Sequence, residues 1–203
     1  MKKNKQLIGR YALLIFGFAV IALGTTLTLY SELGMNPWGT FHQGVAKVTR
    51  LSFGTISQLT GLAVILFSLF FKIYPGVGTV LNMVMIGWMI DRLNQSGLIP
   101  HPTTPLMQYV YLIVGILLFN YGIYIYLVPD LGAGPRDGLM LGLVRMTGIS
   151  VSIIRPMIEI TVITIGVLLG GPLGIGTLLN GFGGGYVLNT IFKLHKYDPK
   201  RKQ

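Results

Sequence analysis

Two pairs of ionisable residues stand in stretches of this chain that are otherwise strongly apolar. Arg155 and Glu159 lie four residues apart in "SIIRPMIEITV", and Arg136 directly precedes Asp137 in "LGAGPRDGLM". Helical spacing puts Arg155 and Glu159 on one face, where their charges can pair or lock helices together. Ionisable groups within apolar helices are costly and usually face a binding site or a bundle interior. The four residues are therefore candidate ligands of a charged solute.

Glycine and proline interrupt the apolar pattern around Arg136. Proline is tolerated in the first turn of a helix, so Pro135, like Pro37 in "LGMNPWGTFH", predicts the start of a short helix. Asn36 is a suitable N-cap for the first of these helices. The unpaired N–H groups at such a start, together with the guanidinium of Arg136, suit a carboxylate or phosphate. Alternatively, Arg136 anchors the topology, with Asp137 as its ion-pair partner and first-turn acid.

Few other residues of the chain could carry chemistry. It has no cysteine, which excludes disulfides and thiolate chemistry, and its three histidines lack neighbouring carboxylates that would complete a metal site. No nucleophile with a base and no pair of acids stands at a catalytic spacing. We therefore expect no metal, no cofactor and no enzymatic activity.

The composition is that of a membrane protein. Of the 203 residues, 52% are hydrophobic and 11% are charged, whereas about a quarter are charged in a typical soluble domain. About 20 apolar residues suffice to cross a bilayer as a helix. Six stretches are expected to do so: Leu7–Tyr30, Phe53–Phe71, Gly76–Ile90, Leu106–Val128, Val151–Leu169 and Gly174–Phe192. The sequence predicts an all-α integral membrane protein and one membrane domain, residues 1–203.

The net charge of +10 gathers at the two ends of the chain, in residues 1–10 and 193–203. Nucleic acid is not the expected partner, because six crossings with both termini in the cytoplasm place twelve basic residues inside and three outside. The lipid bilayer is the expected environment of the protein. The two tails are expected to lie beside lipid headgroups at the cytoplasmic surface.

The chain repeats itself. Residues 11–93 align without a gap on residues 109–191, at an offset of 98, and 21 of the 83 pairs are identical. Three spans in each half reverse the direction of the second, so we expect two inverted repeats, each with a short interfacial or re-entrant helix after its first span. Asn82 and Asn180 are repeat counterparts, which we expect to hydrogen-bond across helices or to line a central cavity.

Several other positions have mainly structural interpretations. In the first short helix, Pro37–Arg50, the apolar face is expected to lie on the membrane interface, with Trp38 as an anchor and His42 facing water. The second short helix, Arg136–Met146, is more apolar and is expected to be buried more deeply. A glycine cluster, Gly181 and residues 183–185, is typical of close helix packing.

The motifs "LGAGPRDGLM", "RPMIE" and "LLGGPLGIGT" resemble the YczE-like membrane proteins, relatives of the broader YitT group, over about residues 11–191. The resemblance implies a multi-pass protein of the bacterial cell (inner) membrane and leaves its activity undefined. It also implies an acidic residue after the Pro-Trp of the first half, where this chain has Gly39. That difference favours a site formed by the second half.

The leading hypothesis is a secondary transporter for a small anionic or zwitterionic solute, which binds between the two repeats. A channel is a related variant. The alternative is a non-transporting accessory or regulatory protein that acts on a membrane partner or forms a homo-oligomer. Because the cytoplasmic loops are short and hold no recognisable domain, its partner contacts would fall on the basic tails or on lipid-facing surfaces.

The charge distribution makes a testable prediction about topology. Because the chain has no cysteine, single cysteines introduced as Asn4→Cys or Gln203→Cys can be labelled without background. Both should be protected from a membrane-impermeant maleimide added to intact cells and should react after permeabilisation. Ready labelling of either position in intact cells would contradict cytoplasmic termini.

Overall fold

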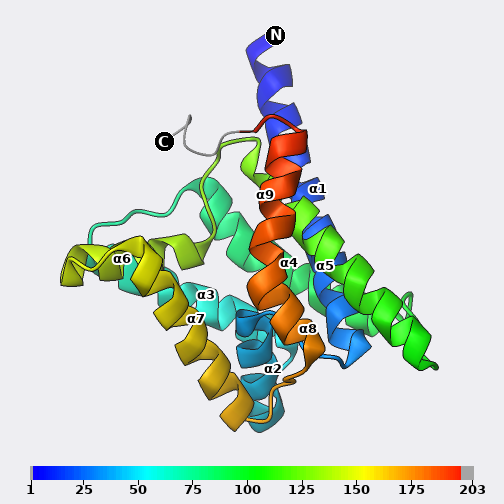
Figure 1. Ribbon diagram of the computed structural model, residues 1–203. Coiled ribbons are helices and arrows are strands. Elements are labelled where there is room, and N and C mark those ends of the chain that lie inside the picture. Colours follow the sequence, from blue (N-terminus) through cyan, green and yellow to red (C-terminus); the bar gives the residue numbers. More distant parts are fainter. Residues whose placement is uncertain (1, 198–203) are drawn as a thin grey trace.

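The computed structural model describes the backbone of residues 2–197 and the side chains from residue 6 on, apart from that of Phe182. All regular elements in this range are helical (Figure 1). They are α1 (Lys2–Ser31), α2 (Pro37–Thr49), α3 (Phe53–Phe70), α4 (Val77–Ser96), α5 (Pro105–Leu127), α6 (Pro135–Thr147), α7 (Val151–Leu168), α8 (Ile175–Leu178), the π-helical turn η1 (Leu179–Gly183) and α9 (Gly184–Leu194). Both predicted short helices are present.

The sequence offset recurs in the helix boundaries. α2 and α6 have 13 residues each and begin at Pro37 and Pro135, and α3 and α7 have 18 each and begin at Phe53 and Val151. α4 corresponds to the stretch from α8 to α9: its first and last residues, moved by the offset of 98, are the first residue of α8 and the last residue of α9. The two halves of the chain therefore contain the same succession of elements.

α1 and α5 form the most extensive helix pair. They run antiparallel, since Gly17 lies against Tyr126 and Gly24 lies against Phe119. A Cβ atom added at Gly24 would lie 2.5 Å from the backbone nitrogen of Phe119. Small residues thus allow the two backbones to touch, as in membrane helix pairs.

The helices form two units, in which the halves of the chain are interleaved. The central unit consists of α1, α4, α5, α8, η1 and α9, with α4 packed on α1 and α9 packed on α5. The peripheral unit consists of α2, α3, α6 and α7, where each short helix packs on the long helix of the other half, α2 on α7 and α6 on α3 (Figure 1). α3 and α4 join the units on one side. On the other side, the described parts of α7 and α9 make at most marginal contact.

The repeated sequence motifs contact each other across the halves. The carbonyl oxygen of Leu33 accepts a hydrogen bond of 2.7 Å from the N–H of Gly176, and that of Leu131 accepts one of 2.7 Å from Gly78. The glycine after each leucine has a φ of 101° or 119°, a conformation that favours glycine. Each Leu-Gly turn therefore satisfies an unpaired donor at the start of a helix in the opposite half.

Basic side chains make a second matched pair of contacts between the halves. Lys47 Nζ donates to the carbonyl oxygen of Gly170 at 2.7 Å, and its counterpart Arg145 donates to that of Phe71 at 3.5 Å. Each carbonyl lies just beyond the end of a long helix, where unpaired acceptors and the negative end of the helix dipole attract cations. The C-terminal ends of the two short helices are thus fixed to the ends of α7 and α3.

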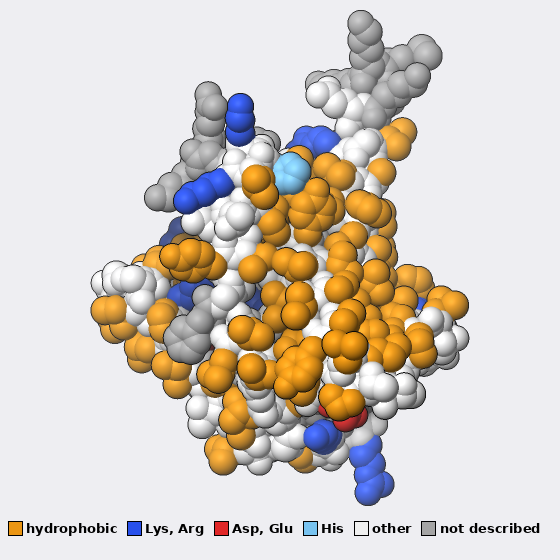
Figure 2. Space-filling model, turned by 45° about the vertical axis from the view of Figure 1, so that its right-hand side comes forward, with side chains coloured by type: hydrophobic (Ala, Val, Ile, Leu, Met, Phe, Trp, Pro, Cys, Tyr) orange, Lys and Arg blue, Asp and Glu red, His pale blue; other side chains and the backbone are white. Residues whose placement is uncertain are grey.

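Four described helical segments are long and apolar enough to cross a membrane: Gln6–Ser31, Phe53–Phe70, Pro105–Leu127 and Val151–Leu168. The other two predicted spans fall short, because α4 carries Asp91 and Arg92 near a polar end and the last stretch is divided by η1. Hydrophobic side chains cover most of the face seen in Figure 2, with charged side chains towards its two ends. This distribution suits a molecule surrounded by lipid.

Two structural expectations for the short helices are wrong. α2 is more buried than α6, and Trp38 and His42 are 7% and 4% exposed. Neither residue lies at a water interface, because α2 packs against α7 and turns small and polar residues inwards.

The tails are only partly described. The α1 start and the α9 end lie at the same end of the molecule (Figure 1). Arg10 donates to the Pro129 carbonyl at 2.9 Å, and Tyr197 donates to that of Leu127 at 3.1 Å. Six of the basic side chains predicted to mark the cytoplasmic side lie outside the described side chains: Lys2, Lys3, Lys5, Lys200, Arg201 and Lys202.

The glycine contact between α1 and α5 gives a stability prediction. Gly24→Val should destabilise the folded protein by about 1–3 kcal/mol or more, as overpacking of a close contact does. Gly9→Val is the matched control, because Gly9 is on the same helix with nothing within 4 Å of an added Cβ. Thermal unfolding in detergent should show a lower midpoint for Gly24→Val alone; equal midpoints for the two variants would contradict this packing.

Candidate functional site

The starts of the two short helices meet at the junction of the two units. Pro37 and Pro135 are the first residues of α2 and α6, as predicted, and the Asn36 side chain accepts a hydrogen bond of 2.9 Å from the N–H of Gly39. The Arg136 Cζ atom lies 4.8 Å from the centroid of the Trp38 ring. These two residues are repeat counterparts, so the duplicated helix starts face each other in a cation–π contact.

Arg136 is surrounded by charged and polar groups from its own helix and from two others. It interacts electrostatically with Tyr126 of α5, with Asp137 beside it, and with Arg155 and Glu159 of α7. Even so, the residue remains accessible to solvent. Packing of the neighbouring helices removes part of its hydration and lowers the pKa of its guanidinium to about 10, so it is a cation at neutral pH. Among the described residues, no hydrogen-bond or ion-pair partner holds it.

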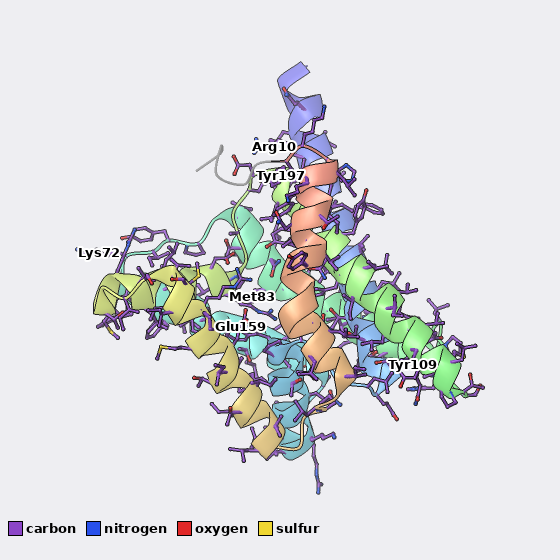
Figure 3. All side chains as sticks on the ribbon, viewed as in Figure 1. Arg10, Lys72, Met83, Tyr109, Glu159 and Tyr197 are labelled. Carbon is purple, nitrogen blue, oxygen red and sulfur yellow. The ribbon has the colours of Figure 1, made fainter. Side chains whose placement is uncertain are left out.

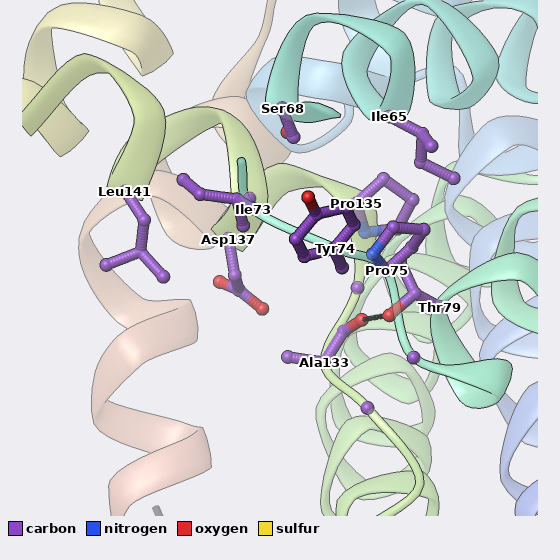
Figure 4. Close-up of a pocket in the computed structure, with 14 residues that line it drawn as sticks. Ile65, Ser68, Ile73, Tyr74, Pro75, Thr79, Ala133, Pro135, Asp137 and Leu141 are labelled. Atoms are coloured by element: carbon purple, nitrogen blue, oxygen red, sulfur yellow. Dashed lines mark hydrogen bonds between the residues drawn. The ribbon is translucent and has the colours of Figure 1, made fainter. Parts of the chain in front are cut away.

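Asp137 occupies the first turn of α6, where its carboxylate accepts a hydrogen bond from the N–H of Gly134. This confirms its predicted place as a first-turn acid, but no described ion pair joins it to Arg136. Burial raises the pKa of the carboxyl above its usual value, against the opposing effects of Arg155, Arg136 and the Gly134 N–H. The side chain points into a cavity of about 190 Å³ whose wall includes Ser68 and Thr79 (Figure 4).

Arg155 and Glu159 form the ion pair that their spacing predicts, with 3.3 Å between Nε and Oε1. Their side chains are 67% and 37% exposed, although both belong to an apolar helix long enough to cross a membrane. Figure 3 shows Glu159 on the side of α7 turned towards α8 and α9. Both residues are within electrostatic range of Arg136, so the structure brings all four charged candidates together.

The three asparagine candidates occupy different positions. Asn36 caps α2. Asn82 comes within about 4.0 Å of where a Cβ at Gly134 would lie, and so reaches the start of α6 from α4. Asn180 donates to the carbonyl of Gly176 in its own helical segment at 2.9 Å, so its predicted bond across helices is wrong. It lies instead within the π-helical turn η1, an irregularity often found at functional sites.

His42 is the residue that sequence reasoning missed. Its Nε2 atom is buried and has no hydrogen-bond partner in the described part of the chain. The imidazole lies among the rings of Trp38, Phe41 and Phe53. Burial, and then the charge of Arg136, lower its pKa to about 3, so the ring is neutral at physiological pH. The spacing of Trp38 and His42, one helical turn apart, was the signal that could have placed them together.

The glycine cluster does not pack as predicted. A Cβ added at Gly181, Gly183 or Gly185 would meet nothing within 4 Å, and only Gly184 approaches a neighbour, the side chain of Asn120. The reason is that α7 does not close against η1 and α9. The glycines therefore leave an open wall opposite the helix that carries Glu159.

Comparison with known proteins agrees with this membrane architecture. Residues 8–193 match the model of a family of unknown function, DUF6198. The chain is 36% identical to an uncharacterized protein of Haemophilus influenzae over 83% of this chain and 76% of the relative. It is 34% identical to the uncharacterized membrane protein YczE of Bacillus subtilis over 91% and 86% of the two chains. No solved structure shows a significant match. The chain is thus a membrane protein that belongs to the family DUF6198 and is related to YczE, as its motifs indicated.

Proposed function

We propose that the protein is a secondary transporter that binds a small anionic or zwitterionic solute at Arg136. One observation carries the proposal: this arginine is charged and accessible, lies between the two units, and has no counter-ion within ion-pair distance among the described residues. Its five donors match a carboxylate or phosphate. Trp38 holds the guanidinium plane from one side, so the donor edges are left for a ligand.

We infer that the chain crosses the membrane six times as two inverted repeats. The antiparallel course of α1 and α5 supports this arrangement, as do the matched helix boundaries. α4 and the stretch from α8 to α9 complete the six crossings, shielded in part by the helices on which they pack. The common position of the α1 start and the α9 end (Figure 1) supports cytoplasmic termini in the inner membrane.

The interleaved halves suggest which parts move. Rigid rocking of one sequence half against the other would break the contacts of α2 with α7 and of α3 with α6. Movement of the peripheral unit against the central unit breaks far fewer. The units are packed at α3 and α4 but open between α7 and α9. Repeat symmetry predicts an opposite state, in which α7 packs on α9 and α3 separates from α4. Arg136 lies where the units meet, as alternating access requires.

Two carboxyl groups could couple this movement to protons. Asp137 is next to the cation, and the pKa of its carboxyl is already raised by burial. Glu159 reaches the same group of charges from α7. Protonation of either carboxyl would leave the site with a net positive charge and strengthen its attraction for an anion.

Solute-induced thermal stabilisation of the purified protein tests the proposal. Carboxylates, phosphates and amino acids are screened against the wild type, and a solute that binds should raise its midpoint. Arg136→Gln should weaken that solute's affinity about tenfold or more, the effect expected when a charge-assisted hydrogen bond is lost. Arg92→Gln should leave it unchanged; Arg92 also lies over an aromatic ring, that of Trp88 at 5.6 Å, but outside the site.

One result would contradict binding of a solute at Arg136. A wild type that no solute in the panel stabilises, together with an Arg136→Gln variant that unfolds far more easily than Arg92→Gln, would make Arg136 a structural residue. That result would favour the non-transporting accessory protein, in which the charges hold helices together.

A further inference from the structure

The contact between α3 and α4 has a counterpart between α7 and α9 that the structure leaves open. A Cβ added at Gly87 of α4 would lie 2.6 Å from the carbonyl oxygen of Gly54 in α3, so these backbones touch. The repeat counterpart of Gly87 is Gly185, where an added Cβ meets nothing within 4 Å. We call the space between α7, with Arg155 and Glu159, and η1 with α9 the α7–α9 crevice.

The residues that close the first contact are replaced in the second. The Asp91 carboxylate accepts a hydrogen bond of 2.9 Å from the Gly54 N–H at the start of α3, and Gln58 donates to the Val84 carbonyl at 2.7 Å. Their counterparts are Asn189 and Pro156. Proline has no donor to offer, and the α7 N-cap, Ser150, makes no side-chain capping bond.

A further pair of contacting residues in α3 and α4 also differs from its counterparts in the second half. Where Gly61 of α3 lies against the Met83 side chain of α4, the second half has Glu159 and Gly181. The side chain that fills the first contact is thus absent from the second. A charged group is introduced on the opposite helix. The contacts that close α3 on α4 therefore have no direct equivalents between α7 and α9.

The chemistry of the crevice differs between its depth and its opening. On its inner side, Arg155 and Glu159 of α7 lie within electrostatic range of Arg136, and the charge of Arg155 is already balanced by Glu159. Towards the outside, apolar side chains of its helices are exposed, such as Ile160 at 63% and Tyr186 at 81%. Since α7 is long and apolar enough to span a membrane, we expect this opening to face hydrocarbon.

We propose that the α7–α9 crevice binds an anionic amphiphile that arrives from within the bilayer. Its phosphate or carboxylate head contacts Arg136, and its hydrocarbon chain lies against the glycine wall of η1 and α9. This inference rests on the proposed function and names the substrate class. A free anion would have to shed its hydration to pass the apolar opening, at a large cost, whereas an amphiphile already has its chain in lipid.

Three probes separate head from chain: oleoyl-lysophosphatidate, glycerol 3-phosphate, which has the head alone, and monooleoylglycerol, which has the chain alone. Binding to the full chain in a neutral maltoside detergent is measured by thermal stabilisation and by native mass spectrometry. We expect lysophosphatidate to bind at least about tenfold more tightly than either of the other two. Arg136→Gln should lower its affinity by a similar factor.

Gly185→Leu tests the crevice itself, because the new side chain occupies the space of the hydrocarbon chain. It should weaken lysophosphatidate binding about tenfold, in line with loss of several buried methylene contacts, and leave glycerol 3-phosphate unaffected. Gly9→Leu, at a glycine equally open on the outer surface of α1, is the matched control. Gly181→Leu serves if Gly185→Leu does not fold.

The outcomes distinguish this inference from the proposed function. Equal binding of glycerol 3-phosphate and lysophosphatidate, both sensitive to Arg136→Gln, would overturn the amphiphile and keep the anion transporter. Lysophosphatidate binding that Gly185→Leu and Gly181→Leu leave unchanged would overturn the crevice as its place. A dimer that Gly185→Leu dissociates would assign the crevice to a second copy of the chain. Binding of none of the three probes would overturn the amphiphile, and the anion site with it if the solute panel also fails.

Discussion

A backbone hydrogen bond made twice holds this structure together. In each half, the leucine carbonyl of a Leu-Gly turn accepts a hydrogen bond from the first turn of a helix in the other half. The donors are the N–H groups of Gly176 and Gly78. An unpaired N–H group in an apolar surrounding is costly, so neither helix start could be left without this acceptor. The same turns set the direction in which α2 and α6 leave the long helices, and therefore bring Trp38 and Arg136 together.

The candidate site thus lies where the two repeats meet, at positions where their sequences differ. At corresponding positions of the two short helices, one half has an aromatic ring and the other a guanidinium, and their contact joins the halves. The charges of Arg155 and Glu159 have Ser57 and Gly61 as counterparts. One half therefore supplies the close packing of α3 on α4, while the other supplies the ionisable groups and the space beside them.

The sequence predicted the helices well and their buried faces poorly. Glycine, proline and capping residues act locally, so α2, α6 and the Asn36 cap lie where expected, and the spacing of Arg155 and Glu159 gave their ion pair. The sequence of α2 predicted a helix on the membrane interface with His42 facing water. Its place depends instead on packing against α7 of the other half, which the spacing of its own residues does not show, so His42 lies inside. The open wall at Gly185 depends on an absent contact between α7 and α9, which local sequence patterns do not encode.

The exchange of short helices between the halves has a consequence for the origin of the chain. The long third helix of each half packs on a short helix of the other half, and each half leaves a helix start without its acceptor. A half-length ancestor could have met these needs only by pairing with a copy of itself. Fusion of two copies would then free each to diverge, so that a ring and a guanidinium could replace two identical side chains where the copies meet.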